Sequence, residues 1–173
     1  AAAAAALREV VALPLSSIDV DTLDAKLGAA KAAGVDDDAT LAQAEEKLRL
    51  TRGTEPALMK NLKELNLEHL TSTLIEQGLS TCAALADLST KALRSQFPEL
   101  SADETASRNL HAATALEIQL RQHPYAVCIV GYDELADGKG KHPFYLIRSA
   151  VKSADGNVTY FNAQHRRKAF EDL

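Results

Sequence analysis

The amino-acid sequence changes character near residue 121. Of the 25 leucines, 22 lie in residues 1–120, whereas seven of the eight aromatic residues lie in residues 121–173. Leucine and alanine favour helices, while aromatic and β-branched residues favour strands. The sequence therefore predicts an α+β protein, in which helices occupy the first part of the chain and a three-stranded antiparallel β-sheet follows.

Charge and hydropathy exclude several classes of protein. The net charge is −5, so the surface lacks the excess of lysine and arginine that follows a nucleic-acid backbone. No apolar run approaches the roughly 20 residues that a membrane helix needs. Cys82 and Cys128 lack the spacing of a metal or redox motif, which favours buried thiols in a reducing compartment. We expect an intracellular protein, soluble or peripheral to a membrane on its cytoplasmic, stromal or matrix face.

Residues 1–50 contain the pattern of a helical hairpin. The six opening alanines carry no pattern of their own. Apolar residues then recur at helical spacing in two arms, the first ending near Gly34 and the second covering residues 39–50. Aspartates at positions 36–38 precede the second arm, where they suit the positive end of its helix dipole. Residues 51–56 form a polar stretch with glycine and proline, which predicts a linker.

Residues 57–121 predict a compact bundle of five short helices. Apolar residues recur at helical spacing in five stretches that are separated by brief connections. Gly78 ends the second stretch, and Ser89 is placed to cap the fourth. The fifth and longest stretch begins behind Ser101 and Glu104, which have the spacing of a capping box.

Several motifs of this bundle are similar to those of the sterile alpha motif (SAM) family. They are Leu65-Asn66-Leu67, Gly78-Leu79, the helix Leu88-Ser89-Thr90-Lys91-Ala92-Leu93, and Arg108 near the start of the last helix. The resemblance covers residues 57–121. It implies a five-helix domain that associates with other protein domains.

The SAM resemblance also implies which residues would carry that association. In this family an acidic middle loop meets the basic start of the last helix of a neighbour, and Asp87 and Glu99 could face Arg94 and Arg108 in this way. The alternative is that the four residues are solvated surface charges, because exposed ion pairs contribute only ~0 to 1 kcal/mol.

Residues 122–173 predict the sheet. Three strands are expected, at residues 125–130, 144–151 and 158–161. The first strand is apolar at nearly every position, so we expect both of its faces to be buried. Asp155-Gly156-Asn157 is a strong hairpin signal between the second and third strands. A basic cluster and the first turn of a helix from Phe170 follow the third strand.

Two motifs of the sheet resemble the opening part of a phox-homology (PX) domain. They are Ile129-Val130-Gly131-Tyr132 and the strand Tyr145-Leu146-Ile147-Arg148-Ser149. Alignment on Phe170 and Leu173 places Arg166 at the family's phosphate-binding arginine. The resemblance implies lipid phosphate binding by Arg166, Arg167 and Lys168, and a guanidinium fork suits a phosphate. The alternative is that this basic cluster faces solvent or an acidic protein partner.

The sequence predicts no enzyme. Residues 125–132 and 144–149 are also similar to a segment of papain-type proteases, but Tyr125 stands at the position of that family's histidine and Ser149 at that of its asparagine. Neither side chain can act as a base near neutral pH. The histidines lack the i, i+4 spacing of a helical metal site, and no glycine-rich phosphate loop precedes a helix. We therefore expect no catalytic residue, no cofactor and no metal.

Two functions fit these features. The first is a non-enzymatic linker or scaffold subunit, whose helical and β surfaces dock on other protein subunits of a larger assembly, such as a photosynthetic or respiratory supercomplex at a membrane. The second is a peripheral membrane adaptor that binds an anionic phosphoinositide lipid through Arg166. Nucleic acid is not an expected partner in either case.

Overall fold

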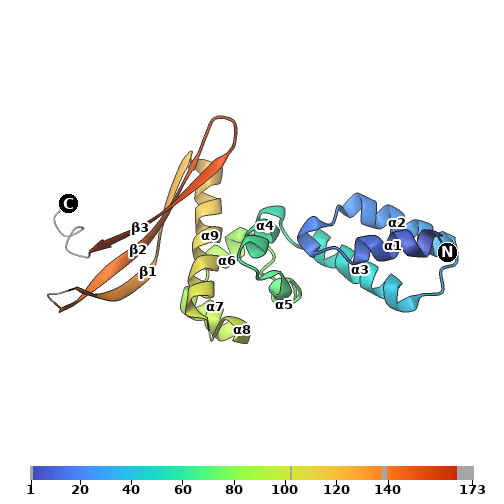
Figure 1. Ribbon diagram of the computed structural model, residues 1–173, viewed down its shortest axis with the longest axis horizontal. Helices are drawn as coiled ribbons and strands as arrows, with labels where there is room; N and C mark the ends of the chain where they lie inside the picture. Colours follow the sequence, from blue (N-terminus) through green and yellow to red (C-terminus); the bar gives the residue numbers. More distant parts are fainter. Residues whose placement is uncertain (1, 102, 138–139, 167–173) are drawn as a thin grey trace. The chain divides into compact units, whose positions relative to one another are not determined.

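The computed structural model describes residues 2–101, 103–137 and 140–166, and it confirms the α+β class (Figure 1). The described part contains nine α-helices and one three-stranded antiparallel sheet. The chain divides into two compact units, Ala1–Thr81 and Cys82–Leu173. This division falls within residues 57–121, and the predicted domain boundaries stay a prediction.

The first unit opens with three helices that pack around a shared apolar core. These are α1 (Ala2–Val11), α2 (Val20–Ala32) and α3 (Asp38–Gly53). The two arms of the predicted hairpin are confirmed as α2 and α3. Gly34 follows α2 with a φ of 61°, a backbone conformation that favours glycine.

Helix α1 is not predicted by the sequence analysis, because alanines alone carry no apolar pattern. Alanine nevertheless has the highest helix propensity of all residues. Leu7, Val10 and Val11 share one face of α1 and are buried in the core that it forms with α2 and α3. The predicted hairpin is therefore completed by a third helix.

Residues 51–56 are mostly helical instead of forming the predicted linker. α3 continues to Gly53, and α4 (Pro56–Glu64) begins three residues later. Proline suits the first turn of a helix, because its missing N–H would have no helical partner there. Thr54 lies between the two helices and is only 6% exposed, so the connection is packed.

Five of the six α-helices described across residues 57–121 correspond to the predicted stretches, and the short helix α8 is additional. Following α4, the chain forms the 3-10 turn η2 (Glu68–Leu70), α5 (Thr71–Glu76), α6 (Cys82–Ala86), α7 (Thr90–Gln96), α8 (Pro98–Ser101) and α9 (Glu104–Gln122). Ser89 caps α7 as predicted, since its Oγ accepts a hydrogen bond from the Ala92 N–H. The predicted capping box is wrong. Ser101 ends the separate helix α8, and the Asp103 carboxylate caps α9.

The sheet consists of three consecutive antiparallel strands in the order β1-β2-β3. The strands are β1 (Tyr125–Asp137), β2 (Gly140–Lys152) and β3 (Val158–Arg166). The predicted hairpin between β2 and β3 is confirmed, with Gly156 at a φ of 86°. A β-bulge interrupts the pairing of β1 with β2, because the register passes from Ile129 to Gly131 and leaves out Val130. The helix expected from Phe170 lies outside the described residues.

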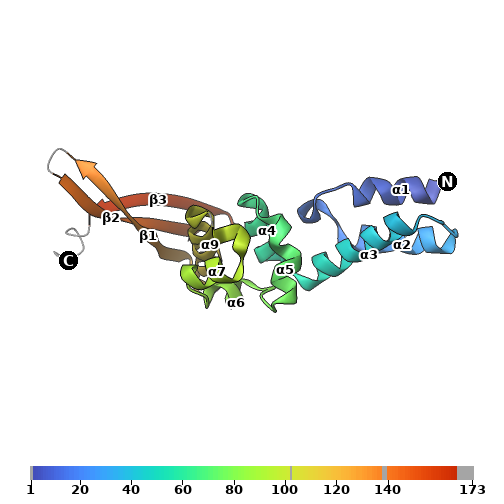
Figure 2. The same cartoon turned by 90° about the horizontal axis from the view of Figure 1, so that it is seen from below.

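Helix α9 packs against one face of the sheet, at the end nearest the β2–β3 hairpin (Figures 1 and 2). Leu116 and Leu120 of α9 form a core there with Ala126 of β1 and Ala150 of β2. The expectation that both faces of the first strand are buried is wrong: Val127, for example, is 53% exposed. An antiparallel sheet with helices on one side leaves its other side uncovered.

The two cysteines differ in burial. Cys82 is buried, as the sequence analysis predicts, whereas Cys128 is only partly buried at the edge of the core under α9. Partial burial raises the pKa of the Cys128 thiol, because it disfavours the thiolate. Cys128 is therefore poorly suited to act as a nucleophile.

Candidate functional site

The side of the sheet that α9 leaves uncovered is the strongest candidate site, and we call it the open face. Its large exposed side chains are Tyr125, Val127, Ile129, Tyr132, Val151 and Phe161. Neighbouring strands place these residues in rows, because side chains of paired residues lie on the same face. One row contains Val127, Ser149 and Phe161, and the next contains Ile129, Ile147 and Ala163.

The bulge in β1 extends the open face. Without it, strict alternation would place Tyr132 on the side opposite Ile129. Because the register leaves out Val130, Tyr132 pairs with Tyr145 and lies on the same face as Ile129. The open face therefore continues past the bulge with a row of two tyrosines.

The open face is comparable in area to the largest apolar patches of monomeric proteins. It spans three strands at a spacing of about 4.8 Å and seven residue steps of about 3.3 Å, which gives roughly 300 Å². None of the described side chains in its rows between residues 125 and 132 is charged. Apolar patches of about this size on monomers are often functional.

A side chain occupies one position on the β1 edge of the sheet. The Gln119 amide of α9 donates a hydrogen bond to the Val127 carbonyl at 3.1 Å and accepts one from the Val127 N–H at 3.0 Å. The amide thus occupies the hydrogen-bonding groups that a neighbouring strand would use at this position of β1. Side chains and bulges at edge strands commonly prevent unwanted pairing with other chains.

The predicted protein-interaction residues are partly brought together. Arg94 of α7 and Arg108 of α9 both contact the Glu104 carboxylate, at 3.4 Å and 2.6 Å. Asp87 and Glu99 are exposed and take part in no ion pair among the described residues. Glu104, which sequence reasoning placed only in a cap, is therefore the acidic centre of this cluster.

The predicted lipid-binding residues are described only in part. Arg166 is the last residue of β3, and its backbone pairs with Phe144 of β2. Arg167 and Lys168 lie outside the described residues. Lipid phosphate binding by this cluster stays a prediction.

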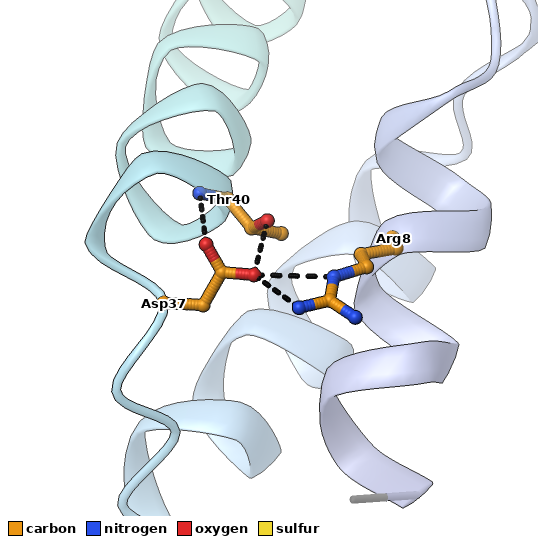
Figure 3. Close-up of polar contacts among 3 residues, drawn as sticks. All are labelled: Arg8, Asp37 and Thr40. Atoms are coloured by element: carbon orange, nitrogen blue, oxygen red, sulfur yellow. Dashed lines mark hydrogen bonds and ion pairs between the residues drawn. The ribbon is translucent and has the colours of Figure 1, made fainter.

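A polar cluster in the first unit connects α1 with the start of α3 (Figure 3). Arg8 donates from Nε and Nη2 to Asp37 Oδ2, at 3.1 and 2.5 Å, and the Thr40 N–H donates to Asp37 Oδ1. The Arg8 hydrogen bond is the main cause that lowers the pKa of Asp37 to about 2, and the bonds from Thr40 add to it. Asp37 thus caps α3 and joins it to α1, which is a structural role. Sequence reasoning placed Asp37 at this helix end but could not find Arg8, which lies 29 positions away.

The described residues contain neither a metal-holding cluster nor a membrane-spanning helix. They contain no group of three or more histidine, cysteine, aspartate or glutamate side chains that could hold a metal ion. No helix within the described ranges combines the length and the apolar character needed to cross a bilayer. Comparisons with models of protein families, with curated proteins and with solved structures found no match to this chain.

Proposed function

We propose that this chain is a non-enzymatic docking subunit, and that the open face of its sheet binds the apolar surface of a different protein in a larger assembly. The observation that carries this proposal is the row of uncovered β-branched and aromatic side chains around Val127, Ile129 and Phe161. Covering such side chains is favourable at about 25 cal/mol per Å² of apolar surface.

The composition of the open face favours a protein partner. The centres of protein interfaces are depleted of charged residues and enriched in tyrosine and phenylalanine. The open face matches this pattern, with Tyr125, Tyr132 and Phe161 among its exposed residues. A surface that binds anionic lipid instead relies on clustered lysine and arginine.

Stable interfaces cover about 1,200 to 2,000 Å² of accessible surface in total. The six large exposed side chains of the open face supply part of this area, and a partner reaches the range by covering the open face together with its surroundings. A second copy of this chain is the alternative occupant, and the oligomeric state of the purified chain distinguishes it.

Photo-crosslinking tests the proposal and identifies the partner. A photoreactive phenylalanine at position 127 should give one defined crosslinked protein in cells, whereas the same group at Ala154, an exposed turn position, should not. The crosslinked protein is then purified, and its affinity for the unmodified chain is measured by calorimetry.

Substitution of Phe161 gives the quantitative test. Phe161 is 52% exposed, so a partner can cover about half of its roughly 200 Å². At about 25 cal/mol per Å², Phe161→Ser should weaken binding by up to about 2.5 kcal/mol, or roughly 70-fold. The control Ala154→Ser should leave the affinity unchanged. Equal crosslinking from both positions, an unchanged affinity of Phe161→Ser, or a stable dimer of the purified chain would contradict the proposal.

A further inference from the structure

A pocket is lined mainly by residues on the opposite side of the sheet from the open face, and Ile147 and Ala163 of the open-face rows also contribute to its lining. It lies beside the first half of α9 and has a volume of about 550 Å³. The residues that matter for its chemistry are Asn109 of α9, Val130, Leu146 and Arg148 of β1 and β2, and Asn162 and Gln164 of β3. All of them belong to the second unit.

Arg148 is the unusual residue of this pocket. Its Nε atom is buried and has no hydrogen-bond partner, and Arg148 takes part in no ion pair among the described residues. The guanidinium stays charged at any physiological pH, so a buried N–H without a partner is costly. Buried polar groups in native proteins are nearly always paired, and an exception calls for an explanation, such as strain, a bound water, an ion or a ligand.

The Arg148 side chain is held in place before any ligand arrives. Its guanidinium lies over the Tyr160 ring, at 5.8 Å from the centroid. An aromatic face attracts a cation and restricts the side chain without using its N–H groups. The Arg148 side chain thus lines the pocket without a hydrogen bond to any other described side chain or backbone group.

We propose that this pocket binds a carboxylate group. Arginine forms paired N–H···O hydrogen bonds with a planar carboxylate. The amides of Asn109, Asn162 and Gln164 offer further donors, while Val130 and Leu146 provide an apolar wall for the carbon attached to the carboxylate. A phosphate monoester, with a charge near −2, is less well matched, because Arg148 is the only cationic residue that lines the pocket as described.

The same chemistry could come from a small organic acid or from an acidic side chain of a protein. Titration of the whole chain, followed by two-dimensional NMR at constant ionic strength, distinguishes them. The probes are acetate and a short blocked peptide with one glutamate. Saturable shifts at the pocket residues with millimolar acetate support the site. A peptide that binds at least as well as acetate indicates a protein source, whereas binding of acetate alone indicates a small acid.

Substitutions at Arg148 complete the test. Arg148→Met should abolish the saturable shifts, and Arg148→Lys should weaken binding roughly tenfold, because lysine cannot form the paired contact. Arg52→Met removes a surface arginine of the first unit, and it should bind acetate like the unmodified chain. Phe161→Ser, on the open face, should also bind acetate normally, so this site and the proposed docking can fail separately.

Three results would overturn the carboxylate site. They are chloride shifts that match those of acetate, tighter binding of inorganic phosphate than of acetate, and unchanged acetate binding in a folded Arg148→Met variant. The NMR spectra themselves report whether each variant is folded. If Arg148→Met does not fold, Arg148→Lys decides the question alone, and equal affinity of that variant for acetate would refute the site.

Discussion

The Gln119 side chain should contribute measurably to the stability of the second unit. Gln119→Leu keeps a side chain of similar size on α9 but removes both hydrogen bonds to the Val127 backbone, at 3.1 and 3.0 Å. A neutral hydrogen bond contributes a net ~0.5 to 1.5 kcal/mol. Val127 is 53% exposed, so water can partly replace the lost partners. We therefore expect the free energy of unfolding to fall by about 1 to 2 kcal/mol.

Tyrosine signals allow this loss to be measured in the second unit alone. All four tyrosines lie between residues 125 and 160, and none lies in the first unit. Urea unfolding followed by near-UV circular dichroism therefore reports on the sheet and on α9. For a unit of about 90 residues, a loss of 1 kcal/mol also lowers Tm by roughly 4 to 8 °C.

Gln122→Leu is the matched control for Gln119→Leu. Gln122 is the last residue of α9, is exposed and makes no hydrogen bond to Val127. Both variants replace a glutamine of α9 with leucine, so the chemical change is the same, and only Gln119→Leu removes the contact with Val127. If the two variants unfold within about 0.3 kcal/mol of each other, the edge contact contributes nothing and the reasoning is refuted.

Three further substitutions test the charge and backbone arguments. The low pKa of Asp37, about 2, means that its ion pair with Arg8 stabilises the first unit above pH 4, and that this contribution is lost as the pH falls from about 4 to about 2. Asp37→Asn should therefore flatten the acid side of the stability profile, measured by circular dichroism at 222 nm, and an unchanged profile would contradict the assignment. Gly28→Ala should stabilise α2 by up to about 1 kcal/mol in urea unfolding, because the added Cβ meets no atom within 4 Å. Gly131→Ala should have the opposite effect, a loss of about 1 kcal/mol, because its Cβ would lie 2.9 Å from Arg108 Nε; a gain in stability would show that Arg108 moves away at no cost.

The sequence predicts most of the helices. It also predicts the glycines that end helices and the serine that caps the start of α7. Gly34 and Gly78 have positive φ values, and Ser89 caps α7, because each of these features depends on a residue and its near neighbours. The β2–β3 hairpin is predictable for the same reason. The end of α8 and the start of α9 are harder to predict from the sequence. Ser101 and Asp103 lie within three positions of each other, and both are residue types that commonly cap the start of a helix.

Features that depend on distant residues are not visible in the sequence. An apolar strand such as residues 125–130 indicates burial, but it cannot reveal that only one layer of helices covers the described sheet. The contact between Gln119 and Val127 depends on the angle at which the chain turns between α9 and β1. The orphaned Nε of Arg148 likewise becomes apparent only when β2, β3 and α9 are placed together.

Because Val130 is the extra residue of the bulge, β1 can lose this one residue without a change of register. Removal of Val130 would leave Ile129 opposite Ile147 and Gly131 opposite Leu146, so every described pair of β1 and β2 could persist in a regular ladder. Deletion of a residue between Ala126 and Ile129 would instead shift the register by one residue. Side chains next to the deletion would then lie on the opposite face of the sheet. A shortened β1 that lacks only Val130 would therefore keep its docking surface intact, while the Arg148 pocket would lose part of its wall.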